Sequence, residues 1–95
     1  MYYIKGHGWV RILPSARKHG VADVDILHVL VYAVRRLMVM DERPGVTLHL
    51  GADSAGRLLE VITVRATDDV GRVIHAMPMR RKYVSYLKEG RGHDG

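Results

Sequence analysis

Apolar residues change their spacing along the chain, from a helical period to an alternating one, and this change limits the folds open to it. After Asp23, a good helix N-cap, apolar side chains recur every three or four residues. The predicted apolar stripe consists of Val24, Leu27, Leu30, Val31 and Val34. Beyond it the pattern alternates, as in half-buried strands. Four candidate strands cover Arg36–Met40, Val46–Gly51, Leu58–Arg65 and Arg72–Met77.

Turn signals set the connections between these elements. Residues 41–45, 53–56 and 67–71 are rich in Asp, Gly, Pro and Ser, so the strands are joined by short turns and run antiparallel. Pro14–His19 reads as a helical turn that Gly20 stops, and Pro78 ends the last strand before a helix over Met79–Lys88. The pattern predicts an α+β fold: N-terminal helices, then an antiparallel meander sheet of three to four strands, then a short C-terminal helix. Residues 2–8 fit either a short edge strand or a disordered arm.

Length and composition narrow the class of protein. A chain of 95 residues holds one hydrophobic core, so we expect a single domain over residues 1–90 with a flexible tail over 91–95. No apolar run approaches the length of a membrane span, and the charged N-terminal residues do not resemble a signal peptide. The absence of cysteine favours the cytoplasm. We therefore expect a cytoplasmic protein without a membrane partner.

The balance of charge points to an anionic partner. Lysine and arginine exceed aspartate and glutamate by 15 to 10, and the pI is about 9.9. The excess gathers around the last strand and the final helix, which suggests a surface for RNA phosphates, although a merely solvated face remains the alternative. The candidate RNA-binding residues are Arg72, Arg81, Lys82, Lys18 and His19.

The second half of the chain also holds the side chains that RNA cleavage without a metal requires. His75 is the candidate general acid or base, because its ordinary pKa lies near neutrality. Arg80 and Arg65 are candidate phosphate clamps, Tyr83 a stacking or orienting residue, and Glu60 a partner that positions His75 or shares the proton transfer. On an ideal strand, however, Glu60 and Arg65 face opposite sides.

Each candidate also has an ordinary explanation. His75 could be a satisfied structural histidine, and Glu60 an exposed strand residue that pairs with an arginine. The six histidines include no pair at helical metal-ligand spacing, and cysteine is absent, so we expect no metal site. No glycine-rich phosphate loop is present either, and no cofactor is expected.

Several motifs, in order, resemble the BrnT-type toxins of the wider RelE-like group. They cover residues 9–87: Trp9, the run Lys18-His19-Gly20-Val21, the helix capped by Asp23, Leu48-Leu50-Gly51, the strand at 56–61, and the strand at 73–76 that leads to Arg80 and Tyr83. The family typically has Ser-Ala-Arg at the end of the last strand and Glu before the final Tyr. Here the strand ends in Met77-Pro78-Met79-Arg80 and Lys82 precedes Tyr83, so Arg80 is proposed as the substitute arginine.

The resemblance implies the toxin of a type II toxin–antitoxin pair, a ribonuclease that halts translation. Its partner would be a DNA-binding antitoxin, often of ribbon-helix-helix type, and the complex would repress its own operon. The resemblance also allows a toxin dimer within that complex. Two alternatives stay open: a non-catalytic basic module that binds nucleic acid or an acidic protein, and an interaction domain that uses the side of the second helix bearing His28 and Tyr32.

Overall fold

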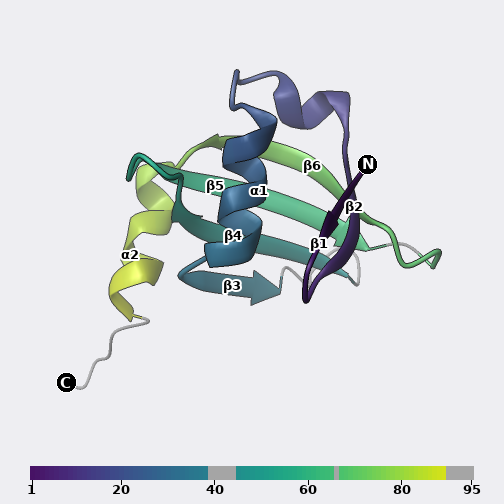
Figure 1. The fold of residues 1–95 in the computed structure, drawn as a ribbon. Helices are drawn as coiled ribbons and strands as arrows, with labels where there is room; N and C mark the ends of the chain where they lie inside the picture. Colours follow the sequence, from purple (N-terminus) through teal and green to yellow (C-terminus); the bar gives the residue numbers. More distant parts are fainter. Residues whose placement is uncertain (39–44, 66, 90–95) are drawn as a thin grey trace.

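The computed structural model describes residues 1–38, 45–65 and 67–89, and its main feature is a mixed sheet of six strands (Figure 1). The strands are β1 (Tyr2–Ile4), β2 (Gly8–Ile12), β3 (Arg35–Met38), β4 (Val46–Ala52), β5 (Leu58–Arg65) and β6 (Gly71–Pro78). Their order across the sheet is β1-β2-β6-β5-β4-β3. The β2–β6 pair is parallel, and the other pairs are antiparallel.

The predicted order of N-terminal helices followed by a three- to four-stranded antiparallel meander is therefore wrong. The chain begins with a hairpin, because Gly6 and Gly8 have φ of +88° and +92° and allow the tight turn between β1 and β2. Residues 2–8 thus contribute an edge strand. The predicted first helix is only a four-residue 3₁₀ turn, η1 (Pro14–Arg17), and the main helix follows two strands rather than preceding the sheet.

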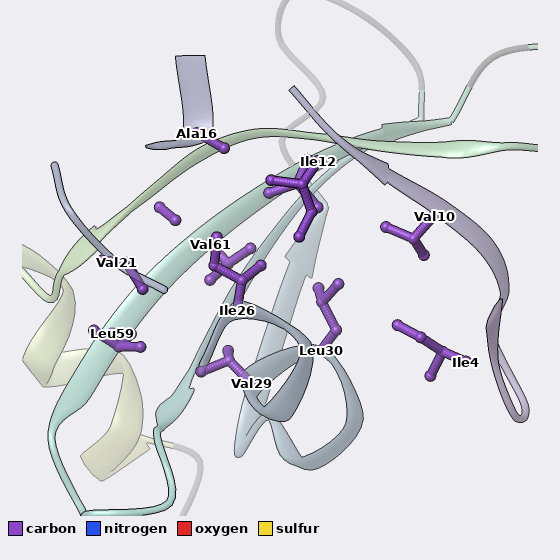
Figure 2. Packing of buried hydrophobic residues seen from close by; sticks show 12 residues of the cluster. Ile4, Val10, Ile12, Ala16, Val21, Ile26, Val29, Leu30, Leu59 and Val61 are labelled. Atoms are coloured by element: carbon purple, nitrogen blue, oxygen red, sulfur yellow. The ribbon is translucent and has the colours of Figure 1, made fainter. Parts of the chain in front are cut away.

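Helix α1 (Asp23–Tyr32) crosses one face of the sheet and covers the core (Figure 1). It buries Ile26, Val29 and Leu30, whose side chains lie between those of the N-terminal hairpin and those of β5 (Figure 2). The predicted stripe is wrong in part, since Val24, Val31 and Val34 are exposed. The helix ends at Tyr32, and β3 then pairs at the sheet edge next to β4.

In the second half of the chain, the strands and the final helix lie close to where the sequence pattern predicts them. Strands β3 to β6 lie at their predicted places, joined in antiparallel order, and α2 (Arg81–Glu89) follows Pro78. Residues 39–44, which include most of the first predicted turn, and the predicted tail 91–95 lie outside the described residues. In the described ranges, neither helix has the length and apolar character needed to cross a membrane.

Candidate functional site

Glu60 is a buried carboxylate in the middle of the sheet. Its neighbours Leu59 and Val61 belong to the core beneath α1. Side chains alternate along a strand, so Glu60 points to the opposite face, which we call the back face. Its side chain is 0% exposed. A charge in such a place must be paired with an opposite charge and hydrogen-bonded.

His75 reaches the back face because β6 contains one extra residue. Ile62 pairs with His75, whereas the next residue of β5, Thr63, pairs with Val73, so Ile74 has no partner across the strands. Without this bulge, His75 would share the core face with Val73. Instead it lies beside Glu60, with its Nε2 atom 2.8 Å from Oε1 of the carboxylate and its side chain 23% exposed.

Arg80 closes the other side of the carboxylate. Pro78 ends β6, and the chain turns so that the backbone N–H of Arg80 donates to Oε2 of Glu60 at 2.9 Å. The guanidinium donates as well, from Nη2 to Oε1 at 2.7 Å and from Nε at 3.1 and 3.2 Å. The start of α2 is thereby fixed to the back face.

These contacts decide the protonation state of Glu60. Burial alone would raise its pKa, but the hydrogen bonds from Arg80 and His75 outweigh burial and bring the pKa below its ordinary value. The carboxylate is therefore ionised at neutral pH and only accepts hydrogen bonds. The hydrogen between the two residues must then lie on Nε2 of His75, so a neutral ring carries its lone pair on Nδ1. A partly exposed imidazole oriented in this way by a buried carboxylate is suited to accept a proton.

A second imidazole lies next to the first. The centroids of the His19 and His75 rings are 5.9 Å apart, and the rings meet edge to face. Ser15 of η1 donates its hydroxyl to the carbonyl of Ile74 at 2.7 Å, which fixes this segment to the bulge. Gly20, with φ of +78°, lets the chain turn directly after His19. The Lys18-His19 pair is thus brought from the N-terminal half to the Glu60 cluster, which we define as Glu60, His75, Arg80 and His19.

Tyr83 borders the cluster on α2. The guanidinium carbon of Arg80 lies 5.4 Å from the centroid of its ring, and Nζ of Lys82 lies 5.1 Å from the same centroid. Both cations are within the range of cation–π attraction. Arg81 and Lys82 are exposed on the first turn of α2, and Lys18 is exposed beside His19. The contacts thus join Glu60, His75, Arg80, His19, Tyr83 and Lys82 at one part of the back face, and Lys18 and Arg81 directly precede members of this group in the chain.

Two predicted site residues lie elsewhere. Arg65 points to the face that carries α1, at the far end of β5, where Nη1 donates to the carbonyl of Asp69 at 3.2 Å. It is not part of the Glu60 cluster. Arg72 lies on the back face but near the other end of β6, with Nη2 2.8 Å from Oδ2 of Asp68. This ion pair lowers the pKa of Asp68.

The N-terminal hairpin adds residues that were not among the predicted site residues. Val10 and Ile12 are in the core, so Trp9 and Arg11 lie on the back face. Tyr3 pairs with Trp9, and their rings meet edge to face at 5.2 Å; both are exposed. Because β2 pairs with β6 in parallel, Arg11 lies alongside Arg72. The alternation of Val10 and Ile12 indicates which side chains of β2 face the core. It places Trp9 and Arg11 on the back face only once this segment is known to be a strand of the sheet.

His49 belongs to a separate, buried group on the α1 face. Its Nε2 atom lies 2.8 Å from the Thr63 hydroxyl oxygen, and Nε of Arg36 donates to its Nδ1 atom at 3.2 Å. In the described ranges, no three His, Asp or Glu side chains gather in a way that would hold a metal ion.

Comparison with protein-family models, with curated proteins and with solved structures gives no match to this chain. Function is therefore argued from the geometry of the Glu60 cluster and of the back face around it.

Proposed function

We propose that this protein is a metal-independent endoribonuclease and the toxin of a toxin–antitoxin pair. The observation that carries the proposal is the 2.8 Å contact between the buried carboxylate of Glu60 and Nε2 of the partly exposed His75. It leaves Nδ1 of the ring with a lone pair that can accept a proton, next to a second imidazole and near the guanidinium of Arg80. This is the set of groups that phosphodiester cleavage by an internal hydroxyl requires.

The reaction that fits this arrangement is transesterification. Nδ1 of His75 removes the proton of the ribose 2′-hydroxyl, and the 2′-oxygen attacks the adjacent phosphorus. The bond to the 5′-oxygen of the next nucleotide breaks, and His19 in its protonated form donates a proton to that oxygen. The products are a 2′,3′-cyclic phosphate and a free 5′-hydroxyl. Glu60 holds the ring of His75 and stabilises the positive charge that forms on it.

Cations beside the cluster stabilise the charge on the phosphate oxygens. Lys18 adjoins His19 and Lys82 adjoins Tyr83, both lysines are exposed, and the Arg80 side chain as a whole is 44% exposed. Arg80 donates at most three of its five side-chain N–H groups to Glu60, so others remain for an oxyanion.

The back face supports single-stranded RNA as the substrate. The exposed Tyr3–Trp9 pair offers a surface on which bases stack, and Arg11 and Arg72 lie between this pair and His75. At about 3.3 Å per residue, the path from Trp9 along the strands to His75 is roughly 15–20 Å, the span of a few nucleotides. A strand of RNA held there would present one phosphate to the Glu60 cluster.

The resemblance to BrnT-type toxins supplies the biological setting of the proposal. A ribonuclease of this kind acts in the cytoplasm, blocks translation and is neutralised by a cognate antitoxin, which we propose to be of ribbon-helix-helix type. The net charge of +5 suits acidic antitoxin segments that cover the basic surface.

One observation favours a second candidate, a non-catalytic module that binds RNA or an acidic protein. Arg80 contacts Glu60 through both its backbone N–H and its guanidinium, so the carboxylate also anchors the start of α2 to the sheet. In this alternative His75 is a further structural partner of Glu60, and the basic surface binds without cleaving.

Incubation of the purified protein with a single-stranded RNA, with and without EDTA, separates the two. The proposal expects cleavage in both conditions and products that end in a 2′,3′-cyclic phosphate. The His28→Ala variant, which changes a histidine of α1 away from the cluster, should cleave like the wild type, whereas His75→Ala should not. Binding of RNA without any cleavage would favour the second candidate.

A further inference from the structure

The α1 face of the sheet contains a cavity of about 310 Å³ that the proposed ribonuclease site does not use. It lies between the β1–β2 turn and strands β3, β4 and β5, and its walls include His7, Arg36, His49, Thr63 and Arg65. A narrow recess of about 50 Å³ extends from it toward Leu30 at the end of α1. The cavity is large enough for an ion with an attached group, at the lower end of the range for small-molecule sites.

The hydrogen bonds around His49 leave one donor for a ligand. Arg36 is always protonated, so its Nε–H donates to Nδ1 of His49, and that nitrogen must carry a lone pair. The neutral ring then has its hydrogen on Nε2 and donates it to the Thr63 hydroxyl oxygen, 2.8 Å away. The hydroxyl hydrogen of Thr63 must point elsewhere, and no side chain or backbone group of the described residues accepts it. Because Thr63 lines the cavity, this donor is available to a guest.

The charged groups of the cavity wall have one sign. Arg36 and Arg65 both line it, and no aspartate or glutamate is among its described lining residues. Arg36 is held by its bond to the carbonyl of Leu30 at 2.6 Å, and Arg65 by its bond to the carbonyl of Asp69 at 3.2 Å. These contacts use only part of the N–H groups of each guanidinium, so both retain donors. Two fixed guanidinium groups without a carboxylate favour an anionic guest.

Gly45 fixes the rim beside Arg65. Its φ is +83°, and a Cβ atom placed there would lie 3.1 Å from the carbonyl oxygen of Arg65. The backbone N–H of Arg65 donates to the carbonyl of Gly45 at 3.1 Å. The position of Arg65 in the wall is therefore set by the backbone of β5 and by this contact.

We propose that the cavity binds a phosphate group, either as free phosphate or as the phosphate of a mononucleotide, through the Thr63 hydroxyl and the guanidinium groups of Arg36 and Arg65. Guanidinium donors match the oxygens of a phosphate in pairs, and the hydroxyl supplies a further donor from the strand between them. The site lies on the face opposite His75, so the inference is independent of the proposed ribonuclease activity.

The test is a titration of the full chain with inorganic phosphate and, separately, with adenosine 5′-monophosphate, at constant ionic strength. Backbone amide NMR signals of Thr63, Arg65 and Gly45 should shift and saturate. Thr63→Val removes the hydroxyl at nearly constant shape, and Arg65→Gln removes a charge; each should weaken binding by about tenfold or more, since hydrogen bonds to charged groups contribute that much. Thr63→Ser retains the hydroxyl and should restore binding.

Arg57→Gln is the matched control, because it removes an exposed arginine just before the other end of β5. It should bind both probes like the wild type. Equal affinity for the two probes would assign the site to the phosphate alone, and tighter binding of the nucleotide would assign it to a mononucleotide. The proposal is overturned if neither probe gives saturable shifts, if Thr63→Val binds as tightly as the wild type, or if Arg57→Gln weakens binding as much as Arg65→Gln.

Discussion

His75 and Glu60 share one face of the sheet only because Ile74 forms a bulge in β6, and this places Nε2 of His75 2.8 Å from Oε1 of Glu60. Bulges often re-aim a side chain beside an active site. The contact can serve catalysis, structure or both, and the consequences of breaking it differ for each role.

His75→Ala should reduce RNA cleavage by about 100-fold or more, because general acid–base groups contribute at least that much. The ring is partly exposed and its loss leaves Glu60 still bonded to Arg80, so the variant should remain folded. Cleavage of a labelled RNA and thermal melting measure the two effects separately. A variant that melts like the wild type and cleaves at the wild-type rate would exclude His75 as acid or base.

Glu60→Gln should make the free energy of unfolding less dependent on pH in the acidic range. Burial opposes ionisation of Glu60, yet the hydrogen bonds from Arg80 and His75 bring its pKa below the ordinary 4.5. The folded pKa is thus lower than the unfolded one, so the ionised group stabilises the fold above about pH 4.5 and this contribution is lost as the pH falls through the folded pKa.

The expected loss for Glu60→Gln at neutral pH is about 1–3 kcal/mol of unfolding free energy, the typical value for hydrogen bonds to a charged group. The difference from the wild type should shrink as the pH falls below about 4.5. Urea unfolding at neutral and acidic pH provides the measurement. A difference that stays constant over this range would show that the charge of Glu60 does not stabilise the fold.

The fold was predictable where it depends on neighbours in sequence. Alternation and turn residues located β3 to β6, since each of these strands pairs with the next along the chain. The parallel pairing of Ile12 with Val73 was not predictable in this way, because local periodicity carries no information on contacts between distant segments. Because the N-terminal hairpin was not expected to join the sheet, the sequence pattern predicted a meander of three to four strands. The structure has a six-stranded mixed sheet.

The candidate site was likewise predictable where its residues lie on strands that follow one another in sequence, and not where distant segments meet. Glu60, His75 and Arg80 were predicted together because they lie on adjacent strands and the following turn, and the structure joins them. Arg65 was grouped with them although alternation places it on the other face, and no bulge in β5 reverses that. The bulge at Ile74 has no signal in the sequence pattern, and Trp9 could join the site only through the unforeseen hairpin.

His49 should remain uncharged well below neutral pH. Burial, and then the nearby charges of Arg36 and His7, lower its pKa from 6.5 to about 4. Below about pH 6.5 the unfolded ring binds a proton that the folded ring does not, so this residue makes the fold less stable as the pH falls toward about 4, by roughly 3 kcal/mol in all. An NMR titration of its ring protons, assigned with His49→Gln, should show no midpoint near neutrality. A midpoint near 6.5 would contradict the buried arrangement.

Charge reversal at Arg81 should weaken RNA binding without regard to sequence. Arg81 is exposed on the first turn of α2, where it can contact a phosphate but no buried group. Arg81→Glu should reduce the slope of log K against log salt by about 1, because one phosphate contact is lost. Lys5→Glu makes the same change at an exposed position in the turn between β1 and β2 and is the control. If both variants lose affinity equally, the effect comes from net charge and not from the back face.

Trp9→Ala should weaken the binding of short single-stranded RNA by roughly tenfold, since stacking of a base on an aromatic side chain contributes about 1–3 kcal/mol. Trp9 is half exposed beside Tyr3, and it is the only tryptophan of the chain, so quenching of its fluorescence reports binding to the wild type directly. Tyr32→Ala is the control, because Tyr32 is an exposed aromatic residue on α1, on the other face. Affinities of both variants are measured with a labelled RNA. Two outcomes would show that the RNA does not cross the N-terminal hairpin on its way to His75. One is an RNA that binds Trp9→Ala as tightly as the wild type, and the other is a wild-type fluorescence that stays unchanged when RNA binds.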